Sequence, residues 1–256
     1  MLAIMSDIHG NLEALRAVGA QLRDADVVYC AGDVVGYGPS PNECCELIRE
    51  LGAKCVQGNH DFVCANLDRL DGADASFSKE DRRLCRAIYS QKNTAAKAAS
   101  RWTSSVLTEE NRRFLRELPL MINEHGLTIV HGKPGSKEDM LNEYMLPGQA
   151  NRSVTESIEG RMLVVGHSHI PMRTPWLVNP GSVGQPRDRN WHAAYAILTD
   201  AWYRFSYVRE TDMSFRLVNQ ISCICRAAYD VRTTVRKIKE QPELPDALGD
   251  RLTVGL

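Results

Sequence analysis

Five short polar segments, each directly after a run of apolar residues, constrain this sequence more than any other feature. The segments are Asp7-Ile8-His9, Gly32-Asp33, Gly58-Asn59-His60-Asp61, His131-Gly132 and Gly166-His167-Ser168-His169. The preceding runs, such as Val27-Val28-Tyr29-Cys30-Ala31 and Met162-Leu163-Val164-Val165, are often β-branched, which favours strands. The polar segments are therefore predicted to lie at strand ends.

The strands are expected to alternate with helices. The apolar residues from Leu12 to Leu22 have helical spacing, and Asn11 is expected to cap that helix. Ser40-Pro41-Asn42-Glu43 has the pattern of a capping box and predicts a second helix from about residue 41 to Leu51. Alternation of this kind predicts an α/β fold with a largely parallel sheet and right-handed crossovers.

The polar segments carry metal-ligand residue types. In an open α/β sheet, ligands bind beyond the carboxyl ends of the strands, so distant segments can converge there. Together they supply five histidines, one asparagine and two aspartates of ligand grade, Asp7 and Asp33. Carboxylate and imidazole ligands suit borderline divalent ions such as Mn, Fe, Co or Zn better than Ca or Mg, which prefer all-oxygen shells. The supply is sufficient for two metal ions.

The order of these motifs resembles the calcineurin-like metallophosphoesterase superfamily, and within it the compact prokaryotic phosphodiesterase branch. The motifs are D-x-H, G-D-x-x-G (Gly32 to Gly36), G-N-H-D, H-G and G-H-x-H. The resemblance covers about residues 1–210 and implies an αββα sandwich of two sheets. Strands are expected at Leu127 to Val130, Met162 to Val165, Trp176 to Asn179, Ala193 to Leu198 and Tyr203 to Val208.

Two further regions are predicted to be helical. Residues from about 62 to 120 are interpreted as a helical cap insertion over the site, with helix caps at Ser78 and Thr108 and a stop at Pro119. Residues 211–256 are expected to form a mixed helical extension, packed on the domain or following it, with helix from Phe215 to Lys239.

The resemblance also implies a ligand set. Metal one would take Asp7, His9, Asp33 and His169, and metal two would take Asp33, Asn59, His131 and His167. Asp33 would bridge two ions that share a water, lower its pKa and hold it as hydroxide for in-line attack on phosphorus. Mn, Fe, Zn, Co and Ni all fit such ligands, and Mn is favoured.

His60 is left without a metal in this assignment and is predicted to be catalytic. A lone histidine is more often structural, but within G-N-H-D it is expected to face the substrate. There a protonated imidazole can neutralise a phosphoryl oxygen or protonate the leaving group. Asp61 is expected to orient His60.

Residues outside the motifs carry weaker expectations. His125 and His192 are expected at the surface. Lys133 is equally expected to lie near the phosphate or to be solvated. Arg187 is less expected to contact a phosphate than not to contact one. Three residues either line the cap side of the site or pack in the core: Asn93, Trp102 and Tyr144.

Composition limits the partners. With 31 basic and 32 acidic residues among 256, the net charge of -1 gives no strong field for nucleic acid. No apolar run approaches the roughly 18 residues of a membrane span, and Asp7 interrupts the N-terminal apolar stretch too early for a secretory signal. A cytoplasmic location is predicted. No C-x-x-C pair indicates a zinc site, and the eight cysteines are expected to be reduced and mostly buried because a disulfide framework is unlikely in a long chain without a signal.

The sequence predicts a dinuclear metal-dependent phosphoesterase, and favours a phosphodiesterase acting on small soluble phosphoesters. A phosphomonoesterase, including a protein phosphatase, would use the same metals with extra basic phosphate clamps, and no obvious arginine pair is present. A dinucleoside polyphosphate hydrolase is a further alternative. A non-catalytic scaffold would have lost a ligand or His60, and neither is lost.

Overall fold

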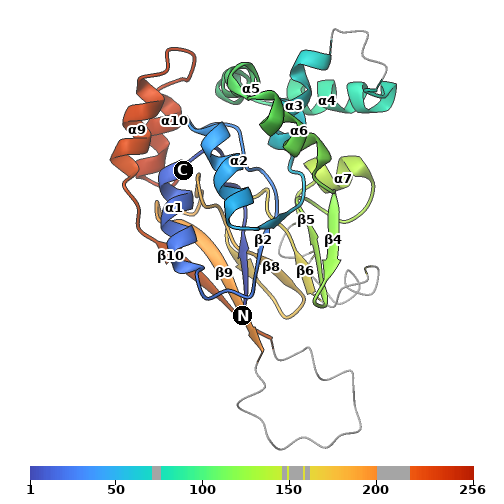
Figure 1. Cartoon of the computed structure of the whole chain (residues 1–256), viewed down its shortest axis with the longest axis vertical. Coiled ribbons are helices and arrows are strands. Elements are labelled where there is room, and N and C mark those ends of the chain that lie inside the picture. The colour runs from blue at the N-terminus through green and yellow to red at the C-terminus, as the bar shows by residue number, and fades with distance from the viewer. Residues whose placement is uncertain (71–75, 146–148, 150–157, 159–161, 201–219) are drawn as a thin grey trace, which may run out of the picture.

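Two five-stranded sheets pack face to face, with helices against the outer side of the first sheet and at one end of the molecule (Figure 1). This computed structural model describes residues 1–70, 76–145, 149, 158, 162–200 and 220–256. The core between the sheets joins Ile4 and Tyr29 of the first sheet to Ile129 and Val164 of the second. The predicted αββα sandwich is confirmed.

The first sheet has the strand order β10-β9-β1-β2-β3. Its strands are β1 (Leu2–Met5), β2 (Val27–Cys30), β3 (Lys54–Cys55), β9 (Ala193–Asp200) and β10 (Gln220–Ala227). Strands β1, β2 and β3 are parallel, because α1 (Leu12–Gln21) and α2 (Pro41–Glu50) connect them as crossovers. Asn11 caps α1 as predicted, whereas the side chain of Ser40 makes no capping hydrogen bond to α2.

The second sheet has the order β4-β5-β6-β8-β7. Its strands are β4 (Met121–Glu124), β5 (Leu127–Val130), β6 (Met162–Val164), β7 (Met172–Arg173) and β8 (Leu177–Asn179). The three central strands are parallel, and β4 and β7 pair antiparallel at the edges. Four of the five predicted strands are confirmed to within two residues, and residues 203–208 lie outside the described part of the chain.

The predicted helix from Phe215 to Lys239 is wrong over residues 220–227, which form β10. All eight residues of β10 pair with β9 in antiparallel register. Ile221 and Ile224 are β-branched and favour a strand once this distant partner is present. The helix α9 (Val231–Lys239) begins only after Asp230, whose side chain caps it. The division between domains at residue 210 stays a prediction.

The cap insertion is helical, as predicted. It contains α3 (Asn59–Asn66), η1 (Leu67–Arg69), α4 (Lys79–Gln91), α5 (Thr94–Val106) and α6 (Glu109–Glu117). Ser78 and Thr108 cap α4 and α6 through their side chains. These helices gather at one end of the molecule, near α7 (Lys137–Asn142) (Figure 1).

The C-terminal segment joins this cap to the first sheet. After α9 it continues through α10 (Ala247–Asp250) and η5 (Arg251–Thr253). The hydroxyl of Thr234 on α9 donates to Oδ1 of Asn11 at 3.0 Å. Ile238 and Leu252 share an apolar cluster with Trp102 of α5. The segment therefore contacts both the first sheet's helix layer and the cap.

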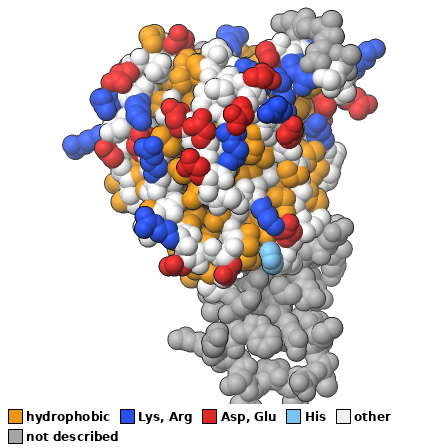
Figure 2. Space-filling view, viewed as in Figure 1, with side chains coloured by type: hydrophobic (Ala, Val, Ile, Leu, Met, Phe, Trp, Pro, Cys, Tyr) orange, Lys and Arg blue, Asp and Glu red, His pale blue; other side chains and the backbone are white. Residues whose placement is uncertain are grey.

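The surface and the cysteines fit the composition. On the face shown in Figure 2, basic and acidic side chains intermingle. None of the described helices is long and apolar enough to cross a membrane. All eight cysteines are free thiols, and six of them are buried.

Candidate metal centre

Five of the seven predicted metal ligands adopt a left-handed backbone conformation. Their φ angles are 55° for Asp7, 50° for His9, 58° for Asp33, 67° for His167 and 60° for His169. Such conformations cost about 1–3 kcal/mol each in residues other than glycine and concentrate at functional sites. The strand-end loops therefore turn sharply at the residues whose side chains converge.

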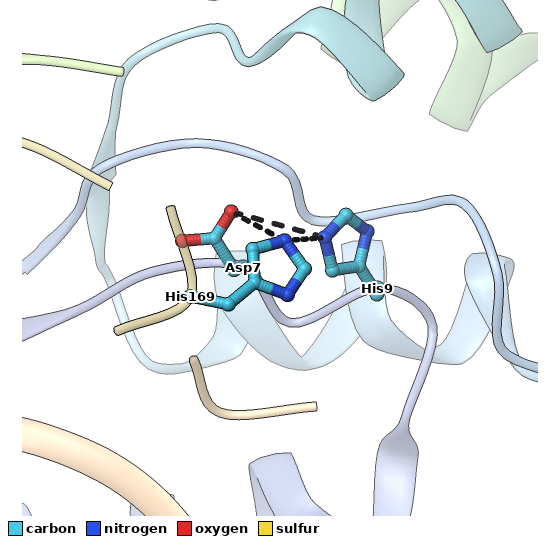
Figure 3. Close-up of side chains that lie close together, drawn as sticks. All are labelled: Asp7, His9 and His169. Atoms are coloured by element: carbon cyan, nitrogen blue, oxygen red, sulfur yellow. Dashed lines mark hydrogen bonds and ion pairs between the residues drawn. The ribbon is translucent and has the colours of Figure 1, made fainter. Parts of the chain in front are cut away.

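The first cluster consists of Asp7, His9 and His169, whose side chains point toward one another (Figure 3). Nε2 of His9 lies 3.0 Å from Nε2 of His169. Oδ1 of Asp7 lies 3.4 Å from Nε2 of His169 and 3.8 Å from that of His9. This oxygen is buried and has no hydrogen-bond partner in the part of the chain that the structure describes. A cation would satisfy it.

The second cluster consists of Asp33, His131 and His167, with Asn59 beside them. Nε2 of His131 lies 3.1 Å from Nδ1 of His167 and 3.1 Å from Oδ1 of Asn59. The carboxylate of Asp33 lies between the two clusters, because its Oδ2 is 3.7 Å from Nε2 of His9 and 3.4 Å from Nε2 of His131. Its other oxygen accepts the backbone N–H of His60 at 2.7 Å. Asp33 is therefore placed to bridge two ions.

Each of the four clustered histidines has one ring nitrogen fixed by a backbone carbonyl. The pairs are His9 Nδ1 with Val35 at 3.1 Å, His131 Nδ1 with Ala31 at 2.8 Å, His169 Nδ1 with Gln185 at 2.6 Å, and His167 Nε2 with Asn142 at 3.3 Å. The fixed nitrogen must donate, so the other nitrogen presents a lone pair to the cluster centre. Histidine ligands in metal sites are oriented in this way.

The amide of Asn59 gives a second test of the fit. With its nitrogen turned inward, this amide could donate to Asp33, His131 and His167 at 3.1–3.2 Å, and its oxygen could accept from Lys92 at 3.2 Å. In the observed orientation, the amide oxygen of Asn59 faces the ring nitrogens of His131 and His167 and the carboxylate of Asp33. All of these atoms carry electron pairs and none supplies a proton to the others. A divalent ion reconciles that arrangement, and the residues present fit two metal ions.

Electrostatics keep most of these histidines in their ligating form. Burial lowers the pKa of His9 and of His167 to about 3, and holds the pKa of His169 well below its usual range. Burial acts in the same direction on His131, but the negative charge of Asp33 outweighs it and raises the pKa to about 9. Burial raises the pKa of Asp7 to about 7. Three histidines are therefore neutral at neutral pH, as metal ligation requires.

His60 lies beside the clusters but lacks a fixed ring nitrogen. Its Nδ1 is buried without a hydrogen-bond partner among the described residues. The ring lies 4.9 Å from that of His9 and 4.5 Å from that of Tyr37, between centroids. Gly36 has a φ of 98°, and a Cβ there would lie 2.4 Å from Nδ1 of His60. The second glycine of G-D-x-x-G therefore makes room for this imidazole.

Asp61 makes no hydrogen bond to His60 among the described residues, and its role in orienting His60 stays a prediction. Its Oδ2 accepts the backbone N–H groups of Asp33 at 2.8 Å and Gly58 at 3.0 Å, and its Oδ1 accepts that of Val35 at 3.1 Å. The bonds from Asp33 and Val35 tie the loop after β2 to the start of α3, and the bond from Gly58 caps α3 itself. Asp61 thus stabilises the loop that carries Asp33.

A pocket of about 310 Å³ opens onto these side chains, between the cap and the C-terminal segment. Its lining includes Asp33, Asn59, His60, His167 and His169, together with Tyr37, Ile88, Gln91, Lys92, Asn93, Ala96, Asn142, Tyr144, Arg187 and Arg251. The cap insertion therefore supplies one wall. Tyr144 stacks on His167, with ring centroids 4.2 Å apart.

Of the predicted residues outside the motifs, some line the pocket and others lie in the core or at the surface. Asn93, Tyr144 and Arg187 line the pocket. Trp102 is buried in the apolar cluster of α5. Lys133 and His125 are exposed and His192 is half-buried, and these three do not line the pocket.

The pocket residues missed by the sequence analysis include one tyrosine and two basic residues, Tyr37, Lys92 and Arg251. Tyr37 could have been found, because it directly follows the G-D-x-x-G motif. Lys92 and Arg251 carry no local signal, since packing of the cap and of the C-terminal segment brings them to the pocket. The expected absence of an arginine pair is also wrong, because Arg187 and Arg251 both line it.

Known proteins resemble this chain over its whole length. An uncharacterized protein of Methanocaldococcus jannaschii is 33% identical over 278 residues, which cover 100% of this chain and 98% of that protein. The crystal structure of a metallophosphoesterase from Sphaerobacter thermophilus is 29% identical, with a TM-score of 0.73, and the match covers 100% of this chain and 98% of that one.

A hypothetical protein from Pyrococcus horikoshii OT3 has the same fold, with a TM-score of 0.76, 23% identity, and coverage of 100% of this chain and 99% of that one. The model of the calcineurin-like phosphoesterase superfamily domain matches residues 1–200. The chain therefore belongs to the calcineurin-like phosphoesterase superfamily.

Proposed function

We propose that this chain is a dinuclear metal-dependent phosphoesterase, with phosphodiesters of small soluble alcohols as the favoured substrates. One ion would be held by Asp7, His9, Asp33 and His169, and the other by Asp33, Asn59, His131 and His167. The observation that carries the proposal is the set of four histidines that each have one ring nitrogen fixed by a backbone carbonyl and the other facing the carboxylates of Asp7 and Asp33. When bound, the ions, with Mn favoured, would activate water and neutralise phosphoryl oxygens.

His60 and Lys92 are the residues proposed to act on the phosphate directly. Burial and the positive charge of Lys92 hold the pKa of His60 well below its usual range. A bound phosphate anion would reverse this shift, because an adjacent negative charge favours the protonated imidazole. His60 would then donate a proton to the leaving oxygen. Lys92 would add positive charge beside Asn59.

The shape of the pocket supports a diester. Its volume of about 310 Å³ exceeds that of a phosphate group, and its lining includes Tyr144, which stacks on His167, and Arg251, which lies over Tyr37. A phosphorus atom held near His60 could therefore carry two substituents within the pocket. Arg187 and Arg251 could also bind the extra negative charge of a phosphomonoester. Hydrolysis of diesters and of monoesters therefore needs a direct comparison.

The test is hydrolysis by protein reconstituted with Mn, Fe, Co, Zn or Ni, measured on a panel of phosphate monoesters, diesters and pyrophosphate esters. The proposal expects metal-dependent hydrolysis, with kcat/KM highest for a diester. Higher values for monoesters would reassign the substrate class. Failure to hydrolyse any member with two ions bound would refute the proposed activity.

A further inference from the structure

Three basic side chains line the pocket beside the metal centre. Lys92 at the end of α4, Arg187 in the loop after β8 and Arg251 in η5 all line it. Asp33 is the one acidic side chain among the described lining residues, and it is a proposed metal ligand. No ion pair joins any of the three cations to a carboxylate within the described residues. Cations gathered without acidic partners favour an anionic ligand.

Arg251 has unused hydrogen-bonding capacity. Its Nε and Nη2 atoms are buried and have no hydrogen-bond partner among the described residues. Burial lowers the pKa of this guanidinium, and the positive charge of Arg187 acts in the same direction. A buried charged donor without a partner is costly. Buried donors without a partner, next to a second positive charge, indicate that an anion binds beside Arg251.

Arg251 is separated from the metal centre by Tyr37. The guanidinium carbon lies 4.8 Å from the centroid of the Tyr37 ring. The same ring also lies near His60, at 4.5 Å between centroids, and His9, at 4.7 Å. An anion bound to Arg251 would therefore occupy a different position from the phosphate that would lie at His60. Lys92, in contrast, reaches Asn59 within the centre.

We propose that Arg187 and Arg251 bind a second phosphate group of the substrate, distinct from the phosphate that is hydrolysed. This inference rests on the proposed phosphoesterase function. Guanidinium groups suit the role because their forked N–H donors bind phosphate oxygens in pairs. The second phosphate could be joined to the first through an anhydride or be carried on another carbon of the alcohol.

The test compares three substrates of the Mn-loaded protein: bis(4-nitrophenyl) phosphate, diadenosine tetraphosphate and adenosine 3',5'-bisphosphate. The first has no second phosphate, the second has an anhydride-linked one, and the third carries it on another carbon. In the Arg251→Gln protein, kcat/KM for the preferred two-phosphate substrate should fall by about 10- to 100-fold relative to bis(4-nitrophenyl) phosphate. Arg251→Lys should lose less, because it keeps the charge.

Arg236→Gln provides the matched control, because Arg236 is exposed on α9 and pairs with Glu240 outside the pocket. It should leave all three activities unchanged. Thermal unfolding of each variant checks that the C-terminal segment still folds. No preference for either two-phosphate substrate, or a preference that survives Arg251→Gln, would overturn the inference.

Binding provides a readout that does not depend on turnover. Calorimetric titration of the Mn-loaded protein should show tighter binding of pyrophosphate than of phosphate, and Arg251→Gln should reduce that difference by about 10- to 100-fold. If esters are hydrolysed without this preference, the inference fails and the proposed function stands. If the preference is present but no ester is hydrolysed, the proposed function fails and the second anion site stands.

Discussion

The floor of the pocket and its walls are built differently. The floor consists of loops at the ends of strands and the start of α3, where five of the seven proposed metal ligands have a strained, left-handed backbone. The walls consist of the cap, Tyr144 and the C-terminal segment, which packing brings together from distant parts of the chain. Chemistry is thus encoded locally, whereas the substrate-facing surface depends on tertiary structure.

Asp33→Asn should have the largest effect, because it removes negative charge from the point that both clusters share. The amide keeps an oxygen for the backbone N–H of His60, so the loop should still fold. Both ions should be lost together, with hydrolysis reduced by at least about 10⁴-fold, the upper end expected for loss of a general acid. Elemental analysis measures the ions, and exposed Asp24→Asn serves as control. Retention of one fully bound ion would argue against a bridge.

His60→Ala separates catalysis from metal binding within the floor. No proposed ligand is removed, so the protein should keep both ions while hydrolysis falls by about 10² to 10⁴-fold. The loss should be larger for alkyl esters than for nitrophenyl esters, since a nitrophenolate departs without protonation. An equal loss would instead indicate electrostatic stabilisation of the phosphoryl oxygens. Full activity would remove His60 from the mechanism.

The same contrast explains which features the sequence could predict. The sandwich and the converging side chains follow from apolar runs that end in recognisable motifs, because ligands gather at strand ends. Strand β10 was missed because its pairing with β9 is a long-range interaction that outweighs local helix signals. Arg251 was missed for a related reason, since the packing of Leu252 and Ile238 against Trp102 determines where it lies.

The two clusters in the floor should respond differently to pH. Asp33 raises the pKa of His131 to about 9, so below that pH an ion entering the second cluster must displace a proton. Its affinity should therefore rise about tenfold per pH unit up to about pH 9. In the first cluster, His9 is already neutral and the pKa of Asp7 is about 7, so affinity should level off above that pH.

Calorimetric Mn titrations at several pH values, in buffers with different ionisation enthalpies, measure both the affinities and the protons released. Two ions with the same pH dependence would contradict the assignment of the raised pKa to His131.

The smallest expected effect is that of a substitution in the cap wall of the pocket. This substitution tests whether the cap wall contributes to substrate selection. Gln91 is exposed at the end of α4, lines the pocket, and accepts a hydrogen bond from Asn142 at 2.9 Å, which links the cap to α7. Gln91→Ala should leave the metal content unchanged, because the floor contributes every proposed ligand. Loss of one neutral hydrogen bond should change the ratio of kcat/KM between two esters by about 2- to 10-fold. Ser90→Ala is the control, since Ser90 is an exposed polar neighbour outside the pocket lining. If both variants left every ratio of kcat/KM unchanged, the substrate would be selected by the floor or by the C-terminal wall of the pocket. The Arg251→Gln variant would then show which of these two regions is responsible.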